Sequence, residues 1–300
     1  MMAAPDSQLD SRPVSQRVRL AKLTTLGVGG EAELWEVGNL VDLREATDEP
    51  YRILGGGSNL LVADSGVPER VIKLGSPFND IGTFGENTDV WLGAATPLPG
   101  LVRRAAAAGF SGLEGLLGIP AVLGGALVMN AGTRFGELSD TFLEAEVFIN
   151  GALERLGPSD LGLAYRHSEL PTGAVVTRVR LGLTPSTPER VRAELEKVDA
   201  ARRGQPKVKS AGCAFKNPAG ESAGRLIDEA GLKGLQVGRA MISPEHGNFI
   251  VNLGGASAAD VTRLLELVRS RVGIPLESEW ELWGFGSQAH EEVACSALSH

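Results

Sequence analysis

Three successive glycines followed by two polar side chains form the first segment of this sequence that could do chemistry. Gly55–Gly57 follow a short predicted strand, Arg52–Leu54, and the run ends in Ser58 and Asn59. The N–H groups of successive glycines can form a concave nest for an anion, which a hydroxyl and a carboxamide can complete. The segment therefore predicts a phosphate-binding loop, with a flexible hairpin as the alternative. It does not match the dinucleotide-binding pattern GxGxxG, and no long helix clearly follows it.

A second glycine-rich stretch, Gly112–Gly136, is apolar and repeatedly interrupted. It reads GLEGLLGIPAVLGGALVMNAGTRFG, which is too broken for a long helix and too apolar for a solvated loop. Because glycine leaves space beside the backbone, such a path suits a buried anionic ligand such as a pyrophosphate. The alternative is a buried strand with tight turns, whose glycines serve packing alone.

A thiol lies in the small-residue segment SAGCAFKNP, Ser210–Pro218. Cys213 is followed closely there by Lys216 and Asn217. The thiol could be a nucleophile, a metal ligand, a proton donor or a buried packing group. No metal-ligand spacing connects the histidines with the cysteines, and no Cys/His protease pattern surrounds Cys213. The residues around the thiol therefore do not choose between chemistry and packing.

Capping and stop residues predict the helices that position these segments. One helix runs over Thr187–Ala201 with Pro188 at its first position, and another over Ser257–Val272, opened by a capping box with Asp260. Two more are expected at Pro99–Ala108 and Ser222–Ala230, each ended by a glycine. Short apolar runs predict strands at Val71–Leu74, Val90–Gly93, Ala145–Ile149, Val175–Leu181 and Asn248–Leu253.

Two polar segments lie outside these elements. The segment Leu276–Trp283 alternates as a strand, which places Glu277, Glu279 and Glu281 on one face. The basic segment Arg202–Lys209 contains Gly-Gln-Pro, and we interpret it as a link between two domains.

Composition and charge limit the class of protein. The chain has 300 residues, of which 43% are hydrophobic, enough for two or three cores. Its net charge of -8 argues against a general nucleic-acid surface but not against a local basic pocket for a small anion. Cys213 and Cys295 are too far apart in sequence to suggest a disulfide framework. The first residues lack the apolar core of a signal peptide, and no stretch approaches the ~20 apolar residues of a membrane span. We therefore expect a cytoplasmic protein with no membrane insertion, no nucleic-acid partner, no obligate protein partner and no metal.

Seven segments of the chain, taken in order, resemble the UDP-N-acetylenolpyruvoylglucosamine reductase family, flavoenzymes of peptidoglycan precursor synthesis. The resemblance runs from about Leu23 to Gly284 and favours the shorter subtype of the family. Several of the motifs are distinctive individually, and their shared order makes coincidence improbable. They read GGGSNLLV, GLEGLLGIP, MNAG, YRHS, SAGCAFKNP, SAGRLIDEAGLKG and HGNFIVN.

The resemblance implies an α+β fold. It consists of a two-subdomain FAD-binding fold of the vanillyl-alcohol-oxidase type and a smaller α+β substrate-binding domain. The final strand near Glu279 is expected to return to the FAD-binding part. The implied division is a flexible N-terminal tail at 1–16, FAD-binding subdomain 1 at 17–75, FAD-binding subdomain 2 at 76–205 completed by 274–287, the substrate-binding domain at 206–273 and a C-terminal tail at 288–300.

The implied reaction moves hydride from NADPH, through FAD, to the enolpyruvyl group of UDP-N-acetylglucosamine-enolpyruvate, giving UDP-N-acetylmuramate. Negative charge then develops at the carbon that bears the carboxylate, and one proton is needed there. By resemblance, Arg166 is the cation beside this carboxylate, and Glu279 is an acid kept neutral so that it can donate. Cys213 stands where the family has its proton donor, often a serine, and a thiol with an ordinary pKa of about 8.5 is a competent replacement. Without the resemblance, Arg166 and Glu279 are typical of exposed salt-bridge residues.

The resemblance also implies binding residues. FAD is expected to contact two groups of backbone positions, and four further side chains match positions near the substrate. The cofactor set is Gly55, Gly56, Gly57, Ser58, Asn59, Leu60, Gly118, Ile119, Gly124, Gly125 and Asn130. The substrate set is Tyr165, Lys216, Asn217 and Arg225.

The sequence departs from the family pattern at two places. After the Ile-Pro pair the family usually has glycine and a hydroxyl residue, whereas Ala121 and Val122 stand here, so a side-chain hydrogen bond at Val122 is not expected. A lysine common just before the Gln-Pro pair is replaced by Gly204, and Lys207 or Lys209 could supply a phosphate contact instead.

Two other functions remain as alternatives. One is a flavin oxidase on the same fold, although neither glycine-rich segment contains the histidine through which many such enzymes attach FAD. The other is a non-catalytic nucleotide-binding protein, against which the presence of Arg166, Cys213 and Glu279 argues.

Overall fold

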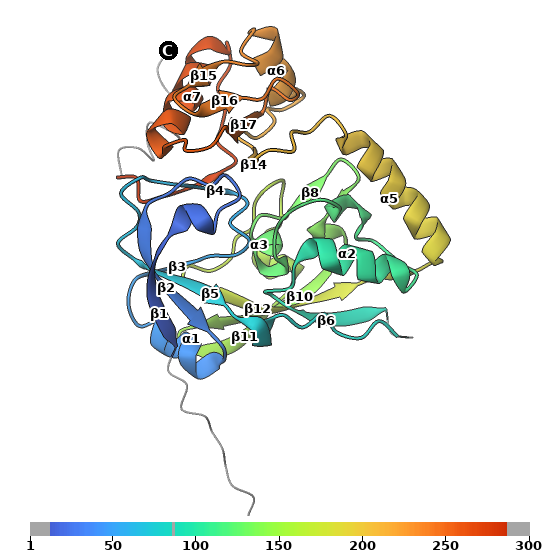
Figure 1. Ribbon diagram of the computed structural model, residues 1–300. Helices are drawn as coiled ribbons and strands as arrows, with labels where there is room; N and C mark the ends of the chain where they lie inside the picture. Colours follow the sequence, from blue (N-terminus) through green and yellow to red (C-terminus); the bar gives the residue numbers. More distant parts are fainter. Residues whose placement is uncertain (1–12, 86–87, 287–300) are drawn as a thin grey trace, which may run out of the picture.

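Three four-stranded sheets organise the chain in the computed structural model, which describes residues 13–85 and 88–286 (Figure 1). The predicted α+β class is confirmed, because two of these sheets are antiparallel, one is mixed, and helices pack on them. The expected C-terminal tail at 288–300 and most of the expected N-terminal tail lie outside the described residues.

The first sheet combines an antiparallel edge with parallel strands. Its order is β1–β2–β5–β3, with β1 antiparallel to β2 and both β2 and β3 parallel to β5. Helix α1 (Leu40–Ala46) packs on β2 and is capped by Asn39, whose carboxamide oxygen accepts from two backbone amides. The strands are β1 (Val14–Arg19), β2 (Glu31–Val37), β3 (Tyr51–Ile53) and β5 (Arg70–Leu74).

The second sheet is entirely antiparallel, in the order β11–β10–β12–β6. Its apolar side chains share one core with helices α2 and α3, so the helices cover the sheet (Figure 1). The strands are β6 (Asp89–Gly93), β10 (Phe142–Ile149), β11 (Ala152–Leu156) and β12 (Val175–Gly182). The helices of this part are α2 (Leu98–Ala107), α3 (Leu123–Val128), α4 (Pro158–Leu161) and α5 (Pro188–Arg202). Two short strand pairs accompany them: β7 (Phe110–Ser111) with β13 (Thr184–Pro185), and β8 (Gly132–Thr133) with β9 (Gly136–Glu137).

The third sheet belongs to a C-terminal lobe, here defined as β14–β17 with α6 and α7, which lies on top of the other two sheets in Figure 1. Its core is not separate, because Leu26, Leu61 and Leu282 from outside the lobe pack into it. The sheet order is β14–β17–β16–β15. The elements are β14 (Ser210–Cys213), α6 (Ala223–Glu229), β15 (Gln236–Val237), β16 (Ala240–Ile242), β17 (Phe249–Asn252) and α7 (Ala258–Arg271).

The helices predicted from caps are confirmed within a residue or two of each end. Thr187 accepts from the Arg190 amide at the start of α5, and Ser257 forms a capping box with Asp260 at the start of α7. Gly109 and Gly231 both have left-handed φ angles just beyond α2 and α6. Local capping chemistry therefore determines these boundaries.

The first described strand lies partly within the range that the sequence assigns to a flexible tail. Strand β1 begins at Val14, inside the range 1–16, and pairs with β2 from Val14 opposite Glu36 to Arg19 opposite Glu31. Five of its six residues are exposed. The strand is thus held by backbone hydrogen bonds rather than by apolar burial, so the sequence carries no hydrophobic pattern that would predict it.

The strand predicted over Leu276–Trp283 is wrong for most of its length. Only Glu281–Trp283 form a strand, β18, which pairs in parallel with β4 (Leu60–Val62). The preceding residues cross from one lobe to the other, since the Glu279 amide donates to the Ala214 carbonyl while the Glu281 amide donates to the Asn59 carbonyl. The returning strand therefore joins subdomain 1 through β4, not subdomain 2.

The junction between the lobes predicts a stability effect at Asp64. Its carboxylate accepts from the Ala258 and Ala259 amides at 2.9 and 3.2 Å, and so caps α7 across 194 residues of sequence. We expect Asp64→Ala to lower the free energy of unfolding by about 1–2 kcal/mol. Asp64→Asn, which keeps an acceptor oxygen, should lose much less. Urea denaturation of the purified variants measures both, and equal stability of the alanine variant and the parent would contradict this capping role.

Candidate active site

A cavity of about 480 Å³ lies where the two glycine-rich stretches meet the C-terminal lobe. Most of the predicted site residues line it. From the first stretch come Gly55 to Leu60, from the second Gly118, Ile119 and Gly125, and from farther along the chain Tyr165, Arg166, Cys213, Asn217 and Glu279. The structure therefore brings together residues that are up to 224 positions apart in sequence (Gly55 to Glu279).

The glycine loop presents free backbone donors to this cavity. Among the described residues, the amides of Gly55 through Asn59 have no hydrogen-bond acceptor. The loop is held from behind, because its Gly57 carbonyl accepts from the Thr25 amide at 2.9 Å. Gly57 has a φ of +63°, and a β-carbon there would lie 2.1 Å from the Leu23 carbonyl oxygen, so only glycine fits. Five successive unpaired amides are a suitable cradle for an anion.

The second glycine-rich stretch packs directly on this loop. A β-carbon at Gly56 would lie 2.8 Å from the Pro120 carbonyl oxygen, and one at Gly55 would lie 3.3 Å from a methyl group of Val122. Val122 precedes α3 without a side-chain capping bond, as its replacement of a hydroxyl residue predicts. The interrupted pattern is also explained, because the stretch contains a 3₁₀ turn at Glu114–Leu116 and the six-residue helix α3.

A smaller cavity of about 120 Å³ continues from the first one between the two stretches. Its wall includes Gly55, Val122, Gly124 and Gly125, so Gly124 faces this smaller space rather than the main cavity. A channel with five free amides at a glycine loop and an apolar continuation fits a dinucleotide cofactor, whose diphosphate needs donors and whose rings need apolar walls. The residues present therefore fit FAD.

Arg166 projects into the main cavity from a strained two-residue turn. Ala164 and His167 exchange backbone hydrogen bonds at 3.1 Å, so Tyr165 and Arg166 form the tip between them. Arg166 has a φ of +54°, a left-handed conformation that costs a non-glycine residue roughly 1 kcal/mol or more. Surrounding contacts must therefore hold this residue in place.

Asn130 supplies part of that support. It is fully buried and does not line the main cavity. Its amide nitrogen donates to the Ala164 carbonyl at 3.1 Å and to Glu137, while its carbonyl oxygen accepts from the Ser139 amide. Although the sequence predicts a cofactor contact, the side chain as placed here fixes the base of the Tyr165–Arg166 turn.

The Arg166 guanidinium is held on two sides. Its Nε donates to Glu279 Oε1 at 3.2 Å, and its Nη2 donates to the Gly132 carbonyl at 2.6 Å. Both charged side chains are mostly buried, with 16% and 15% of their surfaces exposed. The interpretation of Arg166 and Glu279 as exposed salt-bridge residues, which their sequence context alone favours, is therefore wrong.

Burial raises the pKa of the Glu279 carboxyl above its ordinary value, although the positive charge of Arg166 opposes this shift. The backbone of Glu279 is fixed from the opposite side, since its carbonyl accepts from the Asn59 carboxamide at 2.9 Å. Asn59 thus connects the glycine loop Gly55–Asn59 to the backbone of the residue that carries the carboxyl group. A raised pKa makes a protonated, donating form of Glu279 more accessible near neutral pH.

Cys213 ends β14 on the cavity wall contributed by the C-terminal lobe. Burial, and to a lesser extent the nearby negative charge of Glu279, raise the pKa of its thiol to about 12, although the positive charge of Arg166 opposes the shift. The thiol is half-buried and is not in a disulfide. Near neutral pH it therefore carries its proton, as a proton donor requires.

Two predicted substrate residues lie away from the main cavity. Lys216 pairs with Glu277 at 2.7 Å, and Arg225 is half-exposed on α6, where it pairs with Glu221 and Glu229. Neither lines the cavity. Their assignment to substrate therefore stays a prediction that this arrangement of side chains does not itself support.

Two further residues at the cavity were not predicted from the sequence. Asn248 is buried and exchanges hydrogen bonds with the Phe215 backbone at 2.9 and 2.7 Å, which fixes the turn after Cys213. Arg202 reaches the cavity from the end of α5. Asn248 lies in the motif HGNFIVN and Arg202 in a basic run, and either feature could have indicated a binding site. The sequence instead favoured a strand for the first segment and a link between domains for the second.

The described ranges, 13–85 and 88–286, contain neither a candidate membrane span nor a candidate metal cluster. None of their helices is both long and apolar enough to span a bilayer. No three of their histidine, cysteine, aspartate and glutamate side chains are grouped so that they could hold a metal ion.

The chain matches two family profiles. Residues 205–283 match the family described as UDP-N-acetylenolpyruvoylglucosamine reductase, C-terminal domain, and residues 33–155 match the family described as FAD binding domain. Together they span both glycine-rich stretches, the thiol and Glu279.

Named relatives cover nearly the whole chain. It is 57% identical over 276 residues to the UDP-N-acetylenolpyruvoylglucosamine reductase of Deinococcus radiodurans, covering 89% of this chain and 95% of that protein. It is 59% identical over 268 residues to the protein of the same name from Thermus thermophilus, covering 89% and 98%. The crystal structure of UDP-N-acetylenolpyruvylglucosamine reductase (MurB) from Thermus caldophilus superposes with a TM-score of 0.86 at 59% identity, covering 90% of this chain and 99% of that one.

The raised pKa of Cys213 predicts slow alkylation by iodoacetamide. In a Cys295→Ala background, the rate should rise about tenfold per pH unit up to at least pH 10 without a plateau, because only the thiolate reacts. Glu279→Gln removes a negative charge and should lower the thiol pKa, so its rate at a given pH should be higher. A plateau near pH 8 in the parent would show that the thiol is already ionised there.

The close approach at Gly56 predicts loss of cofactor on substitution. In Gly56→Ala the new methyl group meets the Pro120 carbonyl, so the loop must move and its amides lose their common direction. We expect the FAD content of the purified protein to fall at least tenfold, as measured by absorbance at 450 nm. Gly100→Ala, which has nothing within 4 Å of the new methyl group, is the control and should keep its FAD. Full flavin content in Gly56→Ala would contradict this role of the loop.

Proposed function

The chain belongs to the UDP-N-acetylenolpyruvoylglucosamine reductase family, and from this premise we propose how its own residues carry out the reaction. It is an FAD-dependent oxidoreductase of peptidoglycan precursor synthesis. Its substrates are NADPH and UDP-N-acetylglucosamine-enolpyruvate, and its product is UDP-N-acetylmuramate. Such a precursor pathway uses soluble nucleotide sugars, and we propose that the enzyme works in the cytoplasm without an obligate protein partner.

The two glycine-rich stretches hold the cofactor. The free amides of Gly55–Asn59 would bind its diphosphate, and the backbone from Gly118 to Gly125 would form the opposite wall. Bound there, FAD supplies the hydride carrier between NADPH and the terminal carbon of the enolpyruvyl group. Residues 206–273 would bind the nucleotide sugar above it, since β14 of this segment contributes the thiol.

Arg166 binds and stabilises the substrate carboxylate. Hydride addition to the terminal carbon moves an electron pair toward the carbon that bears this carboxylate, so negative charge accumulates there. The guanidinium is pre-positioned by Gly132 and Glu279 and needs no reorientation. A planar fork can donate to two carboxylate oxygens at once, which the ammonium group of lysine cannot.

Glu279 acts as a neutral hydrogen-bond donor beside the same charge. Its pKa is already raised by burial, and a substrate carboxylate brought to Arg166 adds a second negative charge that raises the pKa further. A protonated carboxyl can donate to the developing enolate, whereas a carboxylate would repel it.

Cys213 completes the reaction by giving its proton to the carbon that carries the negative charge. The S–H bond breaks, a C–H bond forms, and the thiolate is reprotonated from solvent that enters the cavity. The single observation that carries the proposal is that this cavity holds the Arg166–Glu279 pair, 3.2 Å apart, together with the Cys213 thiol.

Separating the two half-reactions tests the proton donor. Without oxygen, Cys213→Ala should still be bleached by NADPH at nearly the parent rate. Its recolouring by the enolpyruvyl substrate should be slower by roughly 10²–10⁴-fold, the usual size of a general-acid contribution. Cys213→Ser is the matched control and should be reoxidised much faster than the alanine variant, because a hydroxyl can replace the thiol as donor.

The same experiment separates the alternatives. Reoxidation of Cys213→Ala at the parent rate would rule out the donor role. Parent enzyme that is recoloured by oxygen but not by the enolpyruvyl substrate would indicate a flavin oxidase. A protein that cannot take up FAD would indicate a binding module.

A further inference from the structure

The charged groups on the cavity wall include one cation without a counter-ion. Two guanidinium groups, those of Arg166 and Arg202, line the cavity. Arg166 is paired with Glu279, whereas Arg202 forms no ion pair within the described part of the chain. Burial lowers the pKa of Arg202, which means that its charged form is partly desolvated. A half-buried, unpaired cation facing a cavity favours an anionic ligand.

The position of Arg202 leaves most of its donors available. It is the last residue of α5, and its Nη2 donates to the Gly118 carbonyl at 3.0 Å. Its Nε and Nη1 have no acceptor among the described residues. Gly118 has a φ of +76°, and a β-carbon there would lie 2.8 Å from the Arg202 Nε, so this glycine gives the guanidinium room to reach the cavity. One bond anchors the group, and two donor nitrogens remain for a ligand.

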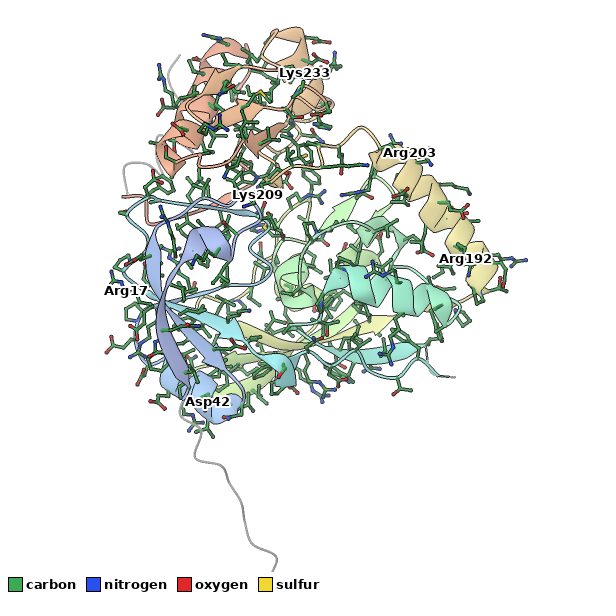
Figure 2. The ribbon with its side chains drawn as sticks, viewed as in Figure 1. Arg17, Asp42, Arg192, Arg203, Lys209 and Lys233 are labelled. Carbon is green, nitrogen blue, oxygen red and sulfur yellow. The ribbon has the colours of Figure 1, made fainter. Side chains whose placement is uncertain are left out.

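The neighbouring basic residues do not share this position. Arg203 is exposed at the end of α5 nearest the C-terminal lobe, and Figure 2 shows its side chain on the outside of the helix end. The Lys209 side chain packs against Gly27, with its Cδ 3.1 Å from the place of a β-carbon there. Gly204 has no side chain. Neither Lys207 nor Lys209 lines the cavity, so this arrangement of side chains does not support the phosphate contact that the sequence offered to them.

We propose that Arg202 binds the diphosphate of the nucleotide-sugar substrate. This inference rests on the proposed function, and it adds a binding residue that the family pattern at Gly204 does not supply. Three diphosphates could enter the cavity, those of FAD, of NADPH and of the nucleotide-sugar substrate, and flavin reduction of Arg202→Gln by NADPH at the parent rate is the result that separates the last two. The cofactor's diphosphate already has the free amides of Gly55–Asn59.

Arg202 shares the cavity with the residues proposed to act on the enolpyruvyl end of the substrate, Arg166, Cys213 and Glu279. Arg202 and the Cys213 thiol line the same cavity, on the two sides of the segment 203–212 that joins α5 to the end of β14. The substrate carries its enolpyruvyl ether and its diphosphate on the same sugar ring. Once the enolpyruvyl carbon reaches Cys213, the diphosphate must therefore lie within a few bonds' length of it, where an unpaired guanidinium is available.

A ligand pair that differs only in the diphosphate tests the assignment. Uridine diphosphate and uridine are titrated into oxidised holoenzyme, with flavin absorbance and calorimetry as readouts that need no turnover. We expect Arg202→Gln to weaken the binding of uridine diphosphate at least tenfold and to leave the affinity for uridine within twofold of the parent's. Arg203→Gln removes the same charge one residue away and should change neither. The KM for the enolpyruvyl substrate should rise with the Kd, while FAD content and flavin reduction by NADPH stay near those of the parent.

Each other result overturns the assignment. Equal affinities of Arg202→Gln and Arg203→Gln for uridine diphosphate would show that Arg202 does not bind the diphosphate. Loss of FAD from Arg202→Gln, with unchanged uridine diphosphate affinity in the reconstituted protein, would assign the residue to the cofactor instead. Failure of the proposed function is distinguishable, because parent holoenzyme would then bind uridine diphosphate through Arg202 and yet not be reoxidised by the enolpyruvyl substrate.

Discussion

The buried ion pair between Arg166 and Glu279 is the contact on which the site depends. It joins residues 113 positions apart, and its two side chains leave only about one sixth of their surfaces exposed. Burying two charges is costly unless each has further hydrogen-bond partners. Here the Gly132 carbonyl takes a second guanidinium donor, while Asn59 fixes the backbone of Glu279. The pair therefore needs the first glycine loop, the second stretch and the returning strand together.

The same constraint explains the local strain around the pair. A left-handed Arg166 at the tip of a two-residue turn is unfavourable alone, and Asn130, itself left-handed and fully buried, holds the base of that turn. A rigid scaffold of this kind keeps a cation aimed at a fixed point without reorganisation when charge develops there. The thiol of Cys213 faces the same space from another lobe, so folding of the whole chain is required before the three groups meet.

Local sequence patterns predicted the helices, whereas contacts between residues far apart in sequence determine which side chains form the site. Thr187, Ser257 and the stop glycines could be interpreted from sequence because caps act within a few residues. The alternation around Glu279 was misleading, because the segment crosses between lobes and its amides bond to two different partners. Arg202 could not be recognised as a site residue, since a basic run before a new element looks the same whether its side chains reach solvent or a cavity.

The pH dependence of a single turnover tests the central claim, that burial and the bound substrate carboxylate together convert Glu279 from the ion-pair partner of Arg166 into a neutral donor. Pre-reduced enzyme is mixed anaerobically with the enolpyruvyl substrate, and flavin reoxidation is followed from pH 5 to pH 10. We predict that the parent rate falls as the pH rises through the pKa of Glu279, and that Glu279→Gln, which always donates, lacks this fall and is much faster than Glu279→Ala. The same alkaline fall in Glu279→Gln, or equal rates for the glutamine and alanine variants, would contradict the claim.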